Sequence, residues 1–425
     1  MFVTYRVAGG QVAEFCRAMC MLAEDGIPDW QARGFSIAVG EELNMKKPIY
    51  LDYNATTPHA PEVIADMRPY LEDHFGNPSS SHAYGRAARE AVETARARVA
   101  ALMGATTDEI IFTSGGTESN NYAIKGAAFA RRERGTHLIT SAIEHPAVLE
   151  VCAWLERNGF DITRLPVDET GRVNPEDLRQ AITSRTVLVS IMHANNEVGT
   201  IQPIRELADI THAHGALMHT DAAQSVGKIP ALVDELGVDL LSVAGHKLYA
   251  PKGVGAIYIR RGVSLEKFMH GADHEQGRRA STENVLEIVG LGAACEIARH
   301  DREQTRTHLK GVTDLLWENL NAAIPDMRLN GHPTERLPNT LNVGFRRVEA
   351  HRLLEAISQD VAASAGSACH SGDISISPVL KAMGTPRDWA GGAIRLSTGK
   401  MTTSEEIMVA VEAIARAVKL CRETI

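Results

Sequence analysis

The sequence predicts an α/β protein, with a large domain built on a mostly parallel central sheet and a smaller α+β domain. Three observations predict this fold class. The chain has 425 residues, which is too long for one simple core. Short apolar runs alternate with helical stretches up to about residue 260. After about residue 300 the alternation stops and a long polar helix begins.

Buried strands are predicted where short apolar runs stand, at residues 109–112, 137–141, 186–192, 216–219 and 240–243. Helices are predicted nearby, at residues 86–103, 146–158, 175–182 and 203–213. Proline opens the last three of these helices, which suits a first turn whose N–H groups have no intrahelical partner. Alternating strands and helices predict a mostly parallel sheet covered on both faces.

The C-terminal part has a different pattern. We predict a long helix at residues 302–323, short strands around 340–345 and 393–396, and a closing helix from Ser404. We therefore assign residues 60–300 to the large domain. The small α+β domain takes residues 45–59 and 301–425.

The first residues follow neither pattern. The apolar stretch 12–22 is interrupted by Glu14 and Arg17, and no clear cleavage site follows it, which argues against a signal peptide. Met45 then opens a well-patterned segment. We interpret residues 1–44 as an extension that is untranslated or disordered, with a genuine appended helix as the alternative.

Composition limits the partners. A net charge of −9 argues against a nucleic-acid surface, and no run approaches the roughly 18 apolar residues of a membrane span. The six cysteines are scattered, without a C-x-x-C pair that would indicate zinc or a redox dithiol. We expect a cytoplasmic protein without a metal, a membrane anchor or direct nucleic-acid binding.

A glycine-rich turn follows the predicted strand at 109–112. It reads Thr-Ser-Gly-Gly-Thr from Thr113, and an amphipathic helix follows. Free backbone N–H groups and the helix dipole at such a turn suit a phosphate. Because this kind of turn is common in α/β proteins, the motif alone leaves phosphate binding open.

Asp221 and Lys247 each follow an apolar strand, at the sheet edge where ligands of open α/β sheets gather. A lone lysine is usually a solvated charge, and a lone aspartate is usually a helix cap. Together with a phosphate turn they form the set that pyridoxal phosphate needs: a lysine for covalent attachment, a carboxylate for the ring nitrogen and an anion site.

A small-residue loop at 364–372 surrounds Cys369. A buried cysteine is normally an inert small hydrophobe, but these neighbours are too small and polar to bury it, so a nucleophilic thiol is predicted. His145 and His246 follow strands; each is either a structural histidine or a group that stacks on a ring or moves protons.

These motifs, in this order, resemble the class V aminotransferase-like enzymes of fold type I, and within them the cysteine desulfurases. The similarity covers Lys47 to about Leu420. The segments that carry it are 50–58, 75–80, 113–121, 195–197, 221–224, 245–247 and 364–372.

The resemblance implies that residues 60–300 bind pyridoxal 5'-phosphate. Lys247 would bind the cofactor covalently, and Asp221 would keep the ring nitrogen protonated. Gln224 would donate a hydrogen bond to the phenolic oxygen, while His145 would stack on the ring and relay protons.

The resemblance also implies ligands for the two anionic groups. The phosphate would be held by Gly116, Thr117 and His246, and by Thr282 from the partner subunit of a homodimer. Asn196 would contact both cofactor and substrate, and it would hold the substrate carboxylate with Arg395, whose planar fork suits that group.

The activity that the resemblance implies is conversion of L-cysteine to L-alanine, with the sulfur passing to Cys369 as a persulfide for iron–sulfur cluster assembly or thiolation. Sulfur-acceptor proteins would be partners. Two departures, Ala244 where many desulfurases have serine and His370 after the cysteine, are similar to selenocysteine lyases. The loop length up to Val379 is instead similar to long-loop desulfurases.

Selenocysteine lyase acting on L-selenocysteine is therefore the alternative function. Two further alternatives are an aminotransferase without cysteine chemistry and a non-catalytic sulfur-carrier scaffold.

Overall fold

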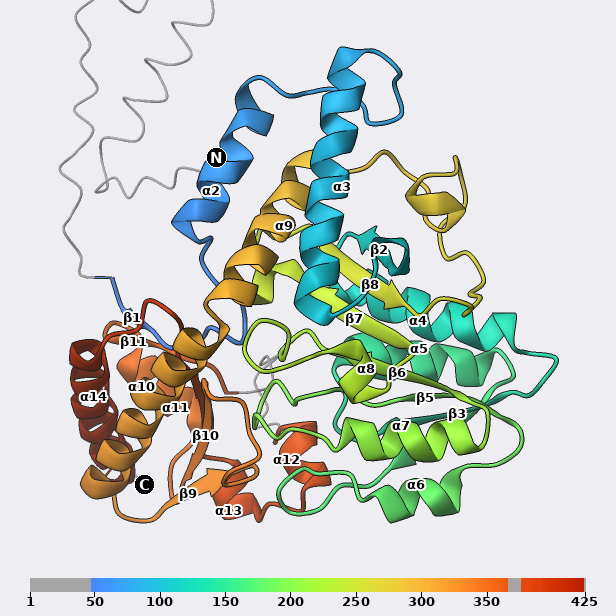
Figure 1. Cartoon of the computed structure of the whole chain (residues 1–425). Coiled ribbons are helices and arrows are strands. Elements are labelled where there is room, and N and C mark those ends of the chain that lie inside the picture. Colours follow the sequence, from blue (N-terminus) through green and yellow to red (C-terminus); the bar gives the residue numbers. More distant parts are fainter. Residues whose placement is uncertain (1–46, 366–375, 424–425) are drawn as a thin grey trace, which may run out of the picture. The chain divides into compact units, whose positions relative to one another are not determined.

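A seven-stranded sheet forms the centre of the computed structural model, which describes residues 47–365 and 376–423 (Figure 1). From one edge to the other its strands are β2 (Ile110–Thr113), β8 (Gly255–Ile259), β7 (Leu240–Ala244), β6 (Leu217–Asp221), β5 (Thr186–Ser190), β3 (His137–Ser141) and β4 (Asp161–Leu165). Neighbours from β7 to β4 run parallel, and only β8 runs antiparallel to both of its neighbours. The prediction of a mostly parallel sheet is confirmed.

Helices cover both faces of this sheet. Strand side chains alternate between the faces, so Ile110 and Phe112 join one apolar cluster while Ile111 joins another. On the first face lie α3 (Ala83–Met103), α6 (Pro175–Ala181), α7 (Ile204–Ala213), α8 (Val233–Leu236) and α9 (Val285–His300). On the second face lie α4 (Gly116–Ala130) and α5 (Pro146–Arg157).

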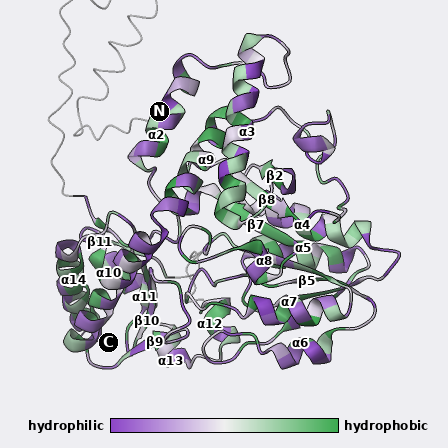
Figure 2. Ribbon diagram, viewed as in Figure 1, coloured by the Kyte–Doolittle hydropathy of each residue, from purple (hydrophilic) through white to green (hydrophobic). Residues whose placement is uncertain are grey.

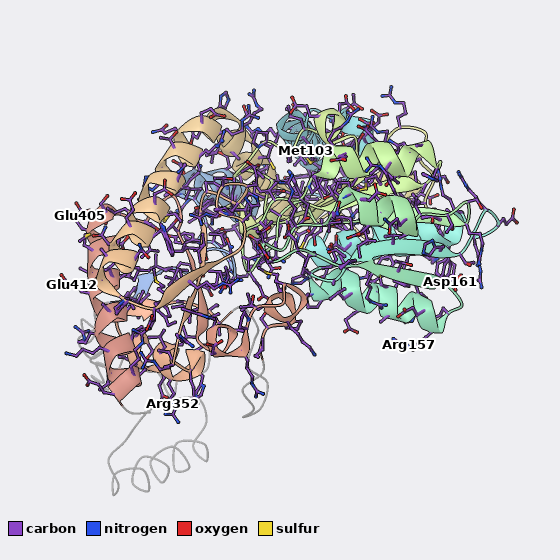
Figure 3. The ribbon with its side chains drawn as sticks, turned by 90° about the horizontal axis from the view of Figure 1, so that it is seen from below. Met103, Arg157, Asp161, Arg352, Glu405 and Glu412 are labelled. Carbon is purple, nitrogen blue, oxygen red and sulfur yellow. The ribbon has the colours of Figure 1, made fainter. Side chains whose placement is uncertain are left out.

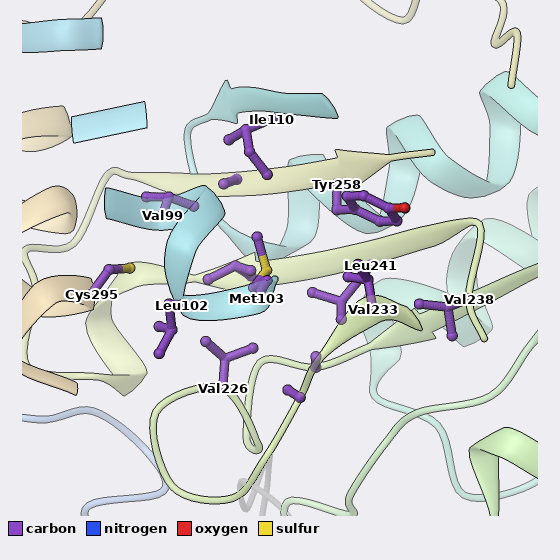
Figure 4. Close-up of a cluster of buried hydrophobic side chains, with 14 of the residues drawn as sticks. Val99, Leu102, Met103, Ile110, Val226, Val233, Val238, Leu241, Tyr258 and Cys295 are labelled. Carbon is purple, nitrogen blue, oxygen red and sulfur yellow. The ribbon is translucent and has the colours of Figure 1, made fainter. Parts of the chain in front are cut away.

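Figure 4 shows how the first face is filled. Val99 and Met103 of α3 point toward Leu241 and Tyr258 of the sheet, and Cys295 of α9 lies on the same face. All of these side chains are buried. Burial of one such side chain contributes about 1.5–3 kcal/mol, so this face is a major source of stability.

A separate apolar cluster lies in the C-terminal part of the chain. Its sheet has the order β12 (Ala393–Ser397), β10 (Thr340–Phe345), β9 (Met327–Asn330), and its helices are α10 (Arg302–Ala323), α11 (Ala350–Ile357) and α14 (Ser404–Glu423). Ile49 and Leu51 join this cluster, and β1 (Ile49–Tyr50) pairs in parallel with β11 (Val361–Ala362). The domain boundaries at residues 60 and 301 stay a prediction.

The remaining elements are short or peripheral: α2 (Pro61–Glu72), α12 (Pro378–Ala382), α13 (Arg387–Ala390), η1 (Thr107–Glu109), η2 (Gly245–Lys247) and η3 (Glu275–Gly277). Two strands of the main sheet escaped prediction from the sequence, β4 and β8. In β4 the residues are mostly polar and partly exposed, so it lacks the apolar run of a central strand. In addition, β5 ends at Ser190, before the predicted end at residue 192.

Hydropathy follows this layering. Figure 2 shows helices such as α7 with one hydrophobic and one hydrophilic side, and charged side chains such as Arg157, Glu405 and Glu412 lie at the surface (Figure 3). Within the described ranges, no helix combines the length and apolar character needed to cross a bilayer.

Candidate active site

A cavity of about 290 Å³ opens where the parallel strands end. Among its lining residues are nine that the sequence singled out: Gly116, Thr117, His145, Asn196, Asp221, Gln224, His246, Lys247 and Arg395. Parallel strands end at one edge of a sheet, so the loops after β3, β5, β6 and β7 all reach this place.

Lys247 lies in η2, directly after β7. Its Nζ donates to the backbone oxygens of Asn54 and Ala55 at 2.6 and 2.8 Å. Burial, and next the charge of Arg395, lower the pKa of Lys247 to about 8. A buried amine with such a pKa is partly neutral near physiological pH, as an attacking amine must be.

Asp221 is the last residue of β6 and is buried. Its Oδ2 accepts a hydrogen bond from Asn120 Nδ2 at 2.6 Å, and its Oδ1 accepts one from the backbone N–H of Ala223 at 2.9 Å. These donors hold the carboxylate in one orientation. A fixed carboxylate at the cavity wall suits a protonated ring nitrogen.

His145 caps the N-terminus of α5, with its Nδ1 accepting from the backbone N–H of Ala147 at 3.1 Å. Burial lowers the pKa of His145. A neutral imidazole that accepts through Nδ1 carries its proton on Nε2. The adjacent Glu144 holds the loop after β3 in place. It accepts hydrogen bonds from Ser141 Oγ at 2.5 Å and from the backbone N–H of Met192 at 3.0 Å.

The N-terminus of α4 forms another wall. Gly115, just before it, has φ 149°, a backbone conformation that favours glycine. The first turn contributes Gly116 and Thr117, and first-turn N–H groups have no intrahelical partner. A Cβ on Gly116 would come within 3.1 Å of the Ala244 side chain, so the backbone approaches the wall closely there. This is a suitable anion site.

His246 also lies at this end of the cavity, and its Nδ1 is 3.2 Å from Thr56 Oγ1. Burial, and next the charge of Lys247, lower the pKa of His246 to about 4. The imidazole is therefore neutral at physiological pH, and it can act as a hydrogen-bond donor to an anion.

Arg395 enters from β12. Its Nη2 lies 2.7 Å from Asp52 Oδ1, and its Nη1 donates to the backbone oxygen of Asn196 at 3.1 Å. Its Nε is buried without a hydrogen-bond partner. Arg395 lines the cavity, and its planar guanidinium suits an oxygen ligand such as a carboxylate.

The donor set fits pyridoxal phosphate. The cavity offers a lysine amine, a carboxylate, a helix N-terminus and an arginine with an unsatisfied buried nitrogen. The helix N-terminus suits an anion, Asp221 suits a protonated heterocycle, and Arg395 suits a carboxylate.

Two predicted positions lie elsewhere. Thr282 is exposed and lines a separate cavity beside Ser281 and Arg279. Cys369 and its neighbour His370 lie outside the described residues.

Several residues of this site were not predicted from the sequence. Asn54, Ala55 and Asn120 line the cavity, and Asp52 pairs with Arg395. All four stand inside segments that the resemblance had marked, 50–58 and 113–121, so the motifs were the available signal. Among the described residues, no group of three or more His, Cys, Asp or Glu is placed to hold a metal ion.

Known proteins match nearly all of the chain after residue 48. The aminotransferase class-V family matches residues 49–409. A cysteine desulfurase IscS from Dictyoglomus turgidum is 48% identical over 89% of this chain and 96% of that protein. Another, from Methanosarcina thermophila, is 48% identical over 90% of this chain and 95% of that protein. A solved structure described as a NifS-like protein has a TM-score of 0.83 and 37% identity, covering 88% of this chain and 100% of its own.

Proposed function

Because this chain belongs to the class-V aminotransferases, and within them to the cysteine desulfurase family, we propose that it uses pyridoxal phosphate to transfer sulfur from L-cysteine to its own Cys369. One observation carries the proposal: Lys247, Asp221 and Arg395, with its unsatisfied nitrogen, line the same cavity.

Bound pyridoxal phosphate supplies an electron-withdrawing ring that stabilises the charge left when the substrate loses its α-proton. Lys247 would hold the cofactor, and its amine, once released, would take that proton. Asp221 would keep the ring nitrogen protonated. Gly116, Thr117 and His246 would bind the phosphate, and Gln224 would donate to the phenolic oxygen.

Arg395 and Asn196 would orient the substrate carboxylate, and His145 would provide a proton from Nε2. Sulfur transfer needs no outside oxidant. The carbon–sulfur bond of L-cysteine breaks, an S–S bond forms at Cys369, and a proton replaces sulfur on the carbon that becomes the methyl group of L-alanine.

The test is mass analysis of the protein after L-cysteine is added to the cofactor-loaded enzyme. We expect L-alanine, together with one added sulfur atom on Cys369. Burial raises the pKa of Cys152 and of Cys295 to about 12, so these two thiols should stay unmodified. Cys369→Ser should form neither product; alanine formation without a persulfide would contradict the proposal.

A parallel assay with L-selenocysteine tests the alternative substrate. Fast turnover of L-selenocysteine with negligible turnover of L-cysteine would establish selenocysteine lyase instead. Retained activity in Cys369→Ala would indicate an aminotransferase, and absence of bound cofactor would indicate a non-catalytic carrier.

We further propose a cytoplasmic homodimer that supplies sulfur to acceptor proteins of iron–sulfur cluster assembly or thiolation. Support for the dimer comes from four exposed large apolar side chains along one segment, Ile64, Leu71, Phe75 and Tyr84. Thr282, exposed outside the cavity, would reach the phosphate of the partner subunit. Light scattering tests the mass, and a monomer would contradict this part.

A further inference from the structure

Lys228 lies behind the wall of the active-site cavity and does not line it. The residue is buried, and its Nζ donates to Gln224 Oε1 at 3.0 Å. None of the ion pairs found among the described residues includes Lys228. A buried lysine without a carboxylate partner is costly, so its presence at this place needs a reason.

Among the residues that the structure describes, Gln224 is the one side chain that accepts a hydrogen bond from Lys228 Nζ, and Gln224 itself lines the cavity. Its Nε2 donates to the backbone oxygen of Asn54 at 3.0 Å, the same oxygen that accepts from Lys247. In its protonated form Lys228 offers donors only, and the carbonyl oxygen of Asn54 offers acceptors only. A reversed Gln224 amide would therefore place N–H against N–H at one end and oxygen against oxygen at the other.

Both neighbours thus select the same orientation of the amide. The nitrogen of Gln224 lies on the Asn54 side, and one of its two N–H groups remains for a ligand in the cavity. An N–H group donates to an oxygen and stabilises that oxygen best when it is negative.

The positive charges around Lys228 also favour an anionic oxygen in the cavity. Lys247 from η2 and Arg395 from β12 both act on Lys228, which in turn acts on His246. Burial, and next these two charges, lower the pKa of Lys228 to about 7. An anionic oxygen in the cavity would offset this accumulation of positive charge.

We propose that Lys228 is a positioning residue that holds the Gln224 amide with its nitrogen toward the cavity, and that it thereby stabilises the ionised phenolic oxygen of pyridoxal phosphate. The inference rests on the proposed function, because it requires that cofactor.

The experiment is a pH titration of the visible absorbance of the bound cofactor in the holoenzyme. In Lys228→Met the phenolic oxygen loses a fixed donor and keeps its proton to higher pH. One hydrogen bond to a charged group stabilises by about 1.5–3 kcal/mol, so the midpoint should rise by about one to two pH units.

Two further variants control for other effects. Lys228→Gln keeps a donor toward Gln224 Oε1 without the charge, so its midpoint should rise less than in Lys228→Met. Lys400 is a partly buried lysine 3.7 Å from Asp301 that does not line this cavity, and Lys400→Met should leave the midpoint unchanged.

A double-mutant cycle shows whether Lys228 acts through Gln224. Gln224→Ala should raise the midpoint, and adding Lys228→Met to it should change nothing more. Additive shifts would mean that Lys228 acts by another route and would overturn the inference.

The two proposals fail in different ways. A wild-type protein that binds no pyridoxal phosphate would overturn the proposed function. A folded, cofactor-loaded Lys228→Met with the wild-type midpoint would overturn only the inference. If Lys228→Met does not fold, Lys228→Gln serves as the test. A wild-type midpoint in Lys228→Gln, together with a wild-type midpoint in Gln224→Ala, would overturn the inference.

Discussion

Two buried arginines, Arg96 and Arg395, each form an ion pair with a carboxylate, and their surroundings differ. Arg96, in α3, bonds Glu275 through Nη1 and Nη2 at 2.7 and 2.8 Å, and the two side chains are 4% and 2% exposed. Its remaining groups reach Glu93 and the backbone oxygen of Ile110. Arg395 pairs with Asp52, but its buried Nε has no partner and the residue lines the cavity.

The difference separates an ion pair enclosed by protein from one that borders a cavity. Glu275 also accepts a hydrogen bond from the backbone N–H of Phe112. The Arg96–Glu275 pair therefore has only protein partners, and it links η3 to β2. Asp52 instead accepts from Ser364 Oγ at 2.9 Å, while Arg395 lines the cavity and its buried Nε has no hydrogen-bond partner. Burial alone therefore does not distinguish the two arginines; the position of Arg395 at the cavity does.

The largest expected effect is on stability, through the Arg96–Glu275 pair. Glu275→Gln leaves the buried Arg96 charge with only the exposed Glu93 as a counter-charge, which should lower the free energy of unfolding by about 3–5 kcal/mol. Urea denaturation measures this loss. Asp161→Asn is the control, because its pair with Arg185 is exposed on both sides and should matter by about 1 kcal/mol or less. Equal losses in the two variants would erase the distinction.

The next effect concerns the pair of Arg395 with Asp52, which borders the cavity and is called the open pair below. Arg395→Lys keeps a positive charge but loses the planar fork, so the KM for L-cysteine should rise by about 100-fold, with a smaller change in unfolding free energy. Steady-state kinetics and urea denaturation of the same preparation separate the two. A variant that unfolds easily but keeps its KM would mean that Arg395 is structural.

A smaller effect links Arg395 to Lys247. The amine of Lys247 must be neutral to attack the cofactor, so the rate of cofactor attachment to cofactor-free protein should rise with pH to a midpoint near 8. Below that midpoint the rate should fall about tenfold for each pH unit. Because the Arg395 charge helps to lower the pKa of Lys247, Arg395→Met should move the midpoint upward by about one pH unit. An unmoved midpoint would show that burial alone sets this pKa.

The smallest effect is expected for Ser364, which donates a hydrogen bond to Asp52 of the open pair. Ser364→Ala removes one hydrogen bond to Asp52 and should cost about 1 kcal/mol of unfolding free energy. Arg395 keeps its own bond to Asp52, so the KM should stay near the wild-type value. A KM change as large as that of Arg395→Lys would show that Ser364 is needed to position the arginine.

Local pattern predicted much of the fold and part of the site. Apolar runs indicated five central strands, and Asp221, Lys247 and the turn at Gly116 were assigned to one edge because parallel strands end together. The pattern failed for β4, whose exposed polar residues hide an edge strand. Thr282 was expected beside the phosphate of a partner subunit, and it stays a prediction.

Lys228 shows why other residues around the site could not be predicted from the sequence. In the sequence it is a lysine after Gly227 in a turn, and lysines in turns are usually solvated. Only the packed structure reveals that it is buried against Gln224. Similarly, Arg395 entered the sequence analysis through the family resemblance, since nothing in its neighbourhood marks a carboxylate site.

The sequence by itself determined the α/β class and the place of Lys247 and Asp221 at the ends of two strands, since strand periodicity and turn chemistry act over a few residues. The tertiary structure decided which side chains complete the site. Asp52 and Arg395 are 343 positions apart, and no local pattern relates them. Their pairing follows from packing of β12 beside the segment after β1, and packing also places Arg395 at the cavity.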